Sequence, residues 1–108
     1  MAYYLMQIAY TPEAWASLVR NPQDRIEAVR PAVERLVGRL QGAWFSFGEY
    51  DLTIILEMPD NVSVAAFSIA VSAGGALKAV KTTPLLPVSE AVEALRRAGG
   101  VDYRPPGG

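Results

Sequence analysis

The chain contains neither cysteine nor histidine among its 108 residues. It therefore has no disulfides, no thiolate nucleophile, no imidazole base and none of the usual ligands of zinc, copper or haem iron. Proton transfer would have to use Asp, Glu, Lys or Tyr, and a bound metal would need oxygen ligands alone. We predict no cofactor and no metal site.

The chain also lacks an excess of either charge and a long apolar run. Ten Lys and Arg residues balance eleven Asp and Glu residues, so no general field favours nucleic acid or an anionic membrane. No apolar run approaches the ~18 residues of a membrane span, and the N-terminal residues do not form a signal peptide. We expect a cytoplasmic protein that binds neither nucleic acid nor membrane.

Apolar residues, in contrast, make up 51% of the chain. A chain of this length forms one domain, and folding buries roughly two-thirds of the surface that the extended chain exposes. So high an apolar share predicts that some of the surface is covered by another subunit. We expect a single domain over residues 1–98 and a flexible Pro/Gly-rich tail over residues 99–108.

The first part of the chain predicts a strand followed by two helices. Residues 3–10 are apolar on both alternating faces, which is typical of a central strand covered on both sides. The Thr-Pro-Glu sequence at 11–13 predicts the start of a short helix. A single apolar stripe over residues 25–40 keeps its phase across Pro31. We therefore predict one helix, kinked at Pro31 and ended by Gly42.

The rest of the chain predicts a hairpin, a nearly apolar helix, a strand and a closing helix. The helix after the hairpin has only serines for polarity, so we expect the C-terminal segment or another subunit to cover it. Pro84 and Pro87 are expected to break the last strand. The predicted bounds are strands over 43–47, 52–58 and 76–83, and helices over about 62–73 and 88–98.

This order predicts a ferredoxin-like β-α-β-β-α-β fold with an added C-terminal helix, which belongs to the α+β class. Its four-stranded antiparallel sheet carries two helices on one face. The other face is also apolar and would be exposed in a monomer. We expect the same face of a second copy to cover it, in a two-fold dimer with facing sheets.

Two short motifs carry a resemblance to a known family. A Gly-x-Tyr-Asp turn precedes a strand that ends in Glu-x-Pro-Asp, and these are Gly48, Tyr50, Asp51 and then Glu57, Pro59, Asp60. The pair resembles the GYD domain family of the dimeric α/β-barrel group, over roughly residues 3 to 85. The resemblance implies a homo-oligomeric architecture rather than a reaction. Lysines in the last strand depart from the family pattern, so no ligand site is carried over to that strand.

Glu57 is the candidate for chemistry. A carboxylate in a strand otherwise made of Leu, Ile and Met must be paired, hydrogen-bonded or partly solvated. The nearest cations in strand order are Lys78 and Lys81, of which only one can share its face. Glu57 is either a structural ion pair or edge carboxylate, or a general base in a half-closed cavity.

Four further side chains are candidate ligand contacts beside Glu57. They are Tyr4, Met6, Trp44 and Tyr50. Each has a plain structural alternative: core or interface packing for the first three, and closure of a barrel end for Tyr50. Trp44 is expected on the face of its strand opposite to the neighbouring phenylalanines.

The remaining motif residues are expected to build structure. Gly48 supplies a positive φ in the hairpin turn, and Asp51 hydrogen-bonds the turn backbone. Asp60 caps the following helix.

Three functions stay open. The hairpin also resembles effector-binding domains of the Lrp/AsnC type, which predicts a small-molecule-binding or regulatory module, although this chain has no helix-turn-helix. A cofactor-free enzyme, isomerase-like or monooxygenase-like, could use Glu57, a tyrosine or Trp44 on an apolar substrate. A structural or partner-binding oligomer needs only the apolar face. We favour the binding module, whose partners would be a second copy and a small apolar or aromatic ligand.

Overall fold

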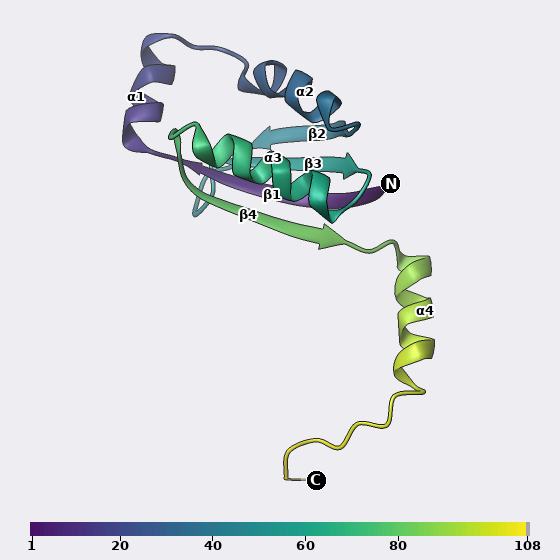
Figure 1. The fold of residues 1–108 in the computed structure, drawn as a ribbon. Coiled ribbons are helices and arrows are strands. Elements are labelled where there is room, and N and C mark those ends of the chain that lie inside the picture. Colours follow the sequence, from purple (N-terminus) through teal and green to yellow (C-terminus); the bar gives the residue numbers. More distant parts are fainter. Residues whose placement is uncertain (108) are drawn as a thin grey trace.

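The computed structural model describes residues 1–107 and shows an α+β domain from which the last helix projects (Figure 1). Its elements follow the predicted order, including the short helix after the first strand. The bounds are β1 Ala2–Tyr10, α1 Pro12–Arg20, α2 Arg25–Arg35, β2 Arg39–Phe45, β3 Leu52–Met58, α3 Asn61–Ala73, β4 Leu77–Leu85 and α4 Val88–Ala98.

The four strands form one antiparallel sheet in the order β2-β3-β1-β4. The helices α2 and α3 pack on one face of it, which is the ferredoxin-like arrangement that the sequence predicted (Figure 1). The other face, which we call the open face, has no helix on it within residues 1–107 of the single chain. β2 and β4 are the two edge strands.

The core lies between the sheet and the helices. Along β3 burial alternates, so that Leu52, Ile54, Leu56 and Met58 are buried while the residues between them are partly exposed. This confirms the predicted faces of that strand. On β1 the even-numbered residues from Tyr4 to Tyr10 are buried in the same way, and Val33, Val64 and Phe67 cover them from the helices. Tyr3, on the open face, is 39% exposed, so β1 is not covered on both faces within one subunit.

The second helix ends earlier than predicted. One helix does run through Pro31, but α2 stops at Arg35 and β2 begins at Arg39, so the predicted end at Gly42 and the predicted start of the strand at residue 43 are wrong. The chain turns at Val37, whose φ is +61°. The apolar stripe continued past the true end because Leu36 and Leu40 pack on the same core from a turn and a strand.

β4 is longer than predicted and runs through Pro84, which is paired with Tyr4 of β1. The prediction that Pro84 breaks the strand is therefore wrong. β4 is an edge strand, and a proline is tolerated there because the missing N–H costs no ladder bond on the outer side. Pro87 does mark the end of the strand region, and α4 begins directly after it as predicted.

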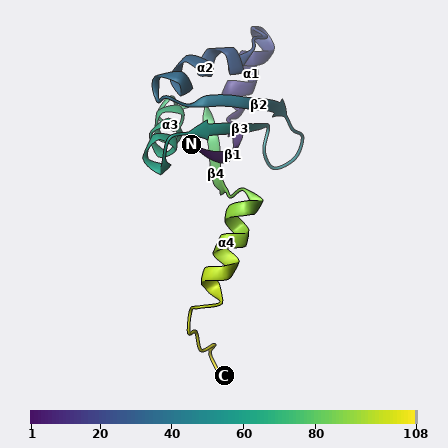
Figure 2. The same cartoon turned by 90° about the vertical axis from the view of Figure 1, so that its right-hand side faces the viewer.

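α4 stands away from the body and covers neither α3 nor the sheet (Figures 1 and 2). The predicted cover of α3 by the C-terminal segment is thus absent from the described residues of one chain. Residues 101–105 follow without helix or strand, and residue 108 of the predicted tail lies outside the described residues. Within residues 1–107, no helix has the length and apolar character needed to cross a membrane.

Candidate functional site

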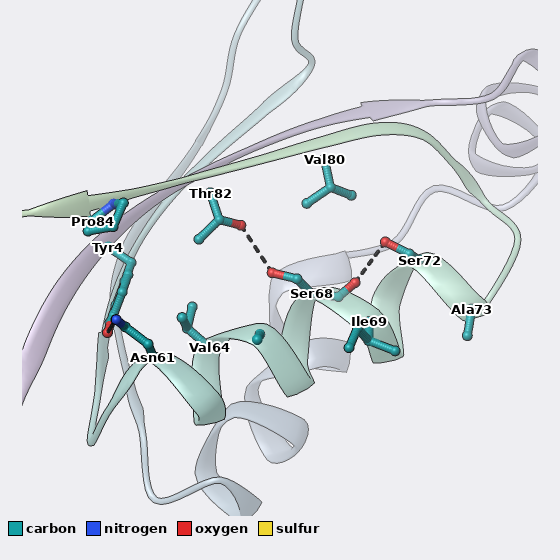
Figure 3. Close-up of a pocket in the computed structure, with 11 residues that line it drawn as sticks. Tyr4, Asn61, Val64, Ser68, Ile69, Ser72, Ala73, Val80, Thr82 and Pro84 are labelled. Atoms are coloured by element: carbon teal, nitrogen blue, oxygen red, sulfur yellow. Dashed lines mark hydrogen bonds between the residues drawn. The ribbon is translucent and has the colours of Figure 1, made fainter.

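A groove of about 840 Å³ lies between α3 and β4, with Tyr4 of β1 at one end (Figure 3). The described residues that line it carry no charge. Its apolar wall consists of Val64, Ala65, Ile69, Ala73, Val80 and Pro84. The groove is therefore an uncharged, mainly apolar surface beside an edge strand.

The groove exists because α3 presents small residues to β4. α3 packs on the core through Val64 and Phe67, which are both buried. On the side toward β4 it carries Ser68 and Ser72, four residues apart and therefore on one face of the helix. These short side chains leave the space between the helix and the strand unfilled.

Three hydrogen bonds place polar groups in this groove (Figure 3). The Tyr4 hydroxyl donates to Asn61 Oδ1 at 2.6 Å, and Ser72 Oγ donates to the Ser68 carbonyl at 2.7 Å. Ser68 Oγ and Thr82 Oγ1 lie 3.0 Å apart and share one hydrogen bond across the groove. Hydroxyl oxygens keep spare acceptor capacity, so these groups can also orient a bound molecule.

Tyr10 is a second buried tyrosine, at the end of β1 opposite to Tyr4. Its ring meets Trp15 edge to face at 5.3 Å, and it lines a smaller cavity of about 270 Å³ between α2 and α3. Burial raises the pKa of Tyr10, the Arg25 guanidinium lowers it and the Asp51 carboxylate raises it. Tyr10 was not among the predicted site residues.

The Gly-x-Tyr-Asp turn has a structural role, because it joins the hairpin to β1 by hydrogen bonds. Asp51 Oδ2 accepts a hydrogen bond from the Tyr10 backbone N–H at 2.9 Å. The carboxylate therefore binds β1, and the prediction that it bonds the turn backbone is wrong. Gly48 has a positive φ of +157°, as expected. Asp60 caps α3 by accepting from the Ser63 N–H at 2.8 Å, and this bond lowers the pKa of Asp60.

Glu57 lies partly exposed on the open face. Gln41 Nε2 donates to Glu57 Oε1 at 3.3 Å, and the register places Arg39 on one side of Glu57 and Tyr3 on the other. The prediction that strand-four lysines are its nearest cations is wrong, because β1 lies between β3 and β4.

Trp44 also lies on the open face, opposite Thr53, whereas Phe45 pairs with Leu52 on the helix side. This confirms the predicted phase for Phe45, whereas Phe47 lies beyond the end of β2 and is almost fully exposed. The indole is 60% exposed. It lies over Gly42, where an added Cβ would come within 2.6 Å of the ring, so a larger residue at this position would have to displace the indole.

The structure does not bring the five candidate ligand contacts together in one subunit. Tyr4 ends the groove, and Met6 is fully buried beside Thr82 in the register. Trp44 and Glu57 lie on the opposite face of the sheet, and Tyr50 lies in the turn. A ligand role for these residues stays a prediction.

Sequence reasoning missed Asn61, Ser68 and Thr82 as groove residues. The signal for Ser68 was present, since the serines were the only polar side chains of an otherwise apolar helix. Elsewhere in residues 1–107, the Asp and Glu side chains form no group of three that could hold a metal.

Fold and site together define a ferredoxin-like α+β domain with an uncharged groove beside its edge strand. The sequence profile of the GYD domain family matches residues 4–95. The chain therefore belongs to the GYD domain family, which confirms the resemblance carried by the Gly-x-Tyr-Asp turn. No curated protein matches the chain.

Proposed function

We propose that this protein is a homo-oligomeric module that binds a small, uncharged and mainly apolar molecule in the groove between α3 and β4. The observation that carries the proposal is the groove itself. Its volume of about 840 Å³ lies within the roughly 300–1,000 Å³ typical of small-molecule sites, and an apolar wall with a few polar groups is the usual composition of such sites.

The ligand is uncharged because the groove offers no counter-ion. A charged group buried without a partner is costly, and the described residues lining the groove are all neutral at pH 7. Hydroxyl or carbonyl groups on the ligand would instead meet the Ser68–Thr82 pair in the middle and the Tyr4–Asn61 pair at one end.

The open face supports the homo-oligomer. It carries apolar side chains from all four strands, with Trp44 60% exposed, Tyr3 39% and Leu85 37%. Leu5 and Ile55 lie between them as a cross-strand pair. A second copy packed with its own open face on this one would remove these side chains from water.

Binding can be tested with two related fluorescent probes. N-phenyl-1-naphthylamine is neutral, and anilinonaphthalene sulfonate carries a charge on a similar aromatic frame. We expect the neutral probe to bind the wild-type protein at least about tenfold more tightly, because only the sulfonate must lose its hydration without a counter-ion.

A variant pair assigns that binding to the groove. Ser68→Leu fills the groove and is expected to weaken binding of the neutral probe at least about tenfold, because it occupies ligand space. Ser17→Leu adds the same apolar group at an exposed position of α1, outside the groove, and should leave binding unchanged. Equal binding by the two variants would refute the proposed site.

A further inference from the structure

α4 is an amphipathic helix whose apolar side packs on no other helix or strand among residues 1–107. Val88, Val92 and Leu95 recur at helical spacing, and Val88 and Leu95 are 80% and 71% exposed. The opposite side carries Glu93, which bridges Arg96 at 3.3 Å and Arg97 at 3.4 Å. A helix with this pattern normally packs its apolar side on another surface.

The groove has no cover among the described residues of the single chain. Binding pockets bury about 70–90% of a ligand's surface, yet this groove is open along one side, and Ile69 on its wall is 69% exposed. As a ligand site it is incomplete. It needs an apolar surface laid over it.

α4 matches the groove in length and chemistry. Its 11 residues span about 17 Å, and the 13 residues of α3 that form one wall span about 20 Å, at a rise of ~1.5 Å per residue. Apolar side chains would face an uncharged groove, while the ion pairs of Glu93 would stay in water. No charge would be buried.

The geometry of the connection favours a second copy over the same chain. Only Leu86 and Pro87 join β4 to α4, and Pro87 is extended, with φ −55° and ψ 146°. A residue before proline is itself held in an extended conformation. α4 therefore leads away from its own body (Figures 1 and 2), and returning to its own groove would require a full reversal within two residues.

We infer that α4 of a second copy lies over the groove between α3 and β4 and closes it, with the two copies exchanging their helices reciprocally. The inference rests on the proposed ligand site in that groove. A two-fold axis makes the exchange symmetric, since each copy gives one helix and receives one. It does not compete with packing of the open faces, because the groove lies on the helix side of the sheet.

The first test places a charge on the apolar side of α4. Val92→Glu is expected to weaken both self-association, measured by sedimentation equilibrium, and binding of N-phenyl-1-naphthylamine, each at least about tenfold, because a carboxylate would be buried without a partner. Ser89→Glu adds the same charge to the polar side and should change neither. Wild-type association and probe binding by Val92→Glu would overturn the inference.

The second test locates the helix without disturbing its apolar side. The chain has no cysteine, so Ala65→Cys in the groove and Ala94→Cys on α4 can be joined by a short bismaleimide in a mixture of isotopically light and heavy subunits. We expect mass spectrometry to find residue 65 of one subunit linked to residue 94 of another. Links confined to one subunit, or no link between these positions, would overturn the inference.

The two proposals can fail separately. If wild-type protein and Val92→Glu bind the neutral probe equally and no link between subunits forms, the ligand site stands and the helix exchange is refuted. If the link between subunits forms but Ser68→Leu does not weaken probe binding, the helix exchange stands and the ligand site is refuted.

Discussion

Replacing Asp51 with alanine tests what the Gly-x-Tyr-Asp turn contributes to the domain. Asp51 Oδ2 accepts from the Tyr10 backbone N–H at 2.9 Å, and the Asp51 backbone N–H donates to the Ile8 carbonyl at 2.7 Å. Together they fasten the turn to the end of β1, where the register with β4 shifts between Ala9 and Tyr10. Asp51→Ala removes the first bond and keeps the second.

The expected cost follows from the charge of the acceptor and the burial of the donor. A hydrogen bond to a charged group contributes about 1.5–3 kcal/mol, and Tyr10 is only 8% exposed, so water replaces the carboxylate poorly. We expect Asp51→Ala to lower the free energy of unfolding by about 2 kcal/mol. Asp51→Asn keeps an acceptor oxygen without the charge and should cost about 1 kcal/mol.

Thermal unfolding followed by circular dichroism measures the difference. In a domain of this size about 1 kcal/mol corresponds to roughly 4–8 °C in Tm, so Asp51→Ala should melt roughly 8–16 °C below wild type and Asp51→Asn about half as far below. Glu49→Ala, in the same turn but exposed, is the control and should melt with wild type. The reasoning is refuted if Asp51→Ala melts with wild type, or if asparagine costs as much as alanine.

Three further substitutions have defined outcomes. Val37→Gly should raise the free energy of unfolding by about 1 kcal/mol in urea titrations, because a left-handed conformation costs a branched residue roughly 1–2 kcal/mol and Val37 is exposed; an unchanged midpoint would contradict this. Burial, partly opposed by Arg25, raises the pKa of Tyr10. The neutral Tyr10 side chain therefore contributes to stability below pH ~10, and this contribution is lost above it. Tyr10→Phe should flatten the decline, above that pH, of the free energy of unfolding measured in urea. Glu57→Gln should leave Tm unchanged, since the glutamate is partly exposed and accepts only from Gln41 at 3.3 Å; a large fall in Tm would make Glu57 structural.

Hydrophobic periodicity predicted the strands and helices wherever one pattern coincided with one element. β3 alternates strictly between buried and partly exposed residues, and its predicted bounds are the observed ones. α4 likewise begins after Pro87 as predicted. In both cases the turn residues on either side agree with the periodicity, so local and tertiary preferences lead to the same boundary.

The end of α2 could not be predicted because glycine, the usual signal of a helix end, does not occupy the left-handed position. The Gly38 N–H bonds the Val33 carbonyl at 3.0 Å and the Val37 N–H bonds the Glu34 carbonyl at 2.9 Å, which is the Schellman pattern of a helix end. That pattern normally has glycine at the left-handed position, but here Val37 occupies it. Glycine is instead needed one position later, at Gly38, because a Cβ there would collide with the Met58 sulfur. This is a tertiary contact that no local pattern reveals.

The groove was only partly predictable for a related reason. The sequence showed serines on an apolar helix, but the 3.0 Å contact between Ser68 and Thr82 depends on which strand lies beside α3. That neighbour is set by the strand order β2-β3-β1-β4. The register of β4 then brings Thr82 opposite Met6 and Pro84 opposite Tyr4. This pairing could not be predicted from the sequence, because the strand was expected to end at Pro84.

The alternation of strands also decides which of the candidate residues can act together. Tyr4 on β1 faces the helices, while Glu57 on β3 is paired with Tyr3 and faces the other way. No side-chain rotation within one subunit can bring Glu57 through the sheet into the groove, because successive residues of a strand point to opposite faces. A reaction that uses Glu57 would therefore take place on the open face, against a second copy, and not in the groove. Glu57→Gln separates the two surfaces: it should leave binding of a neutral probe in the groove unchanged, and weakened binding would mean that the probe lies on the open face.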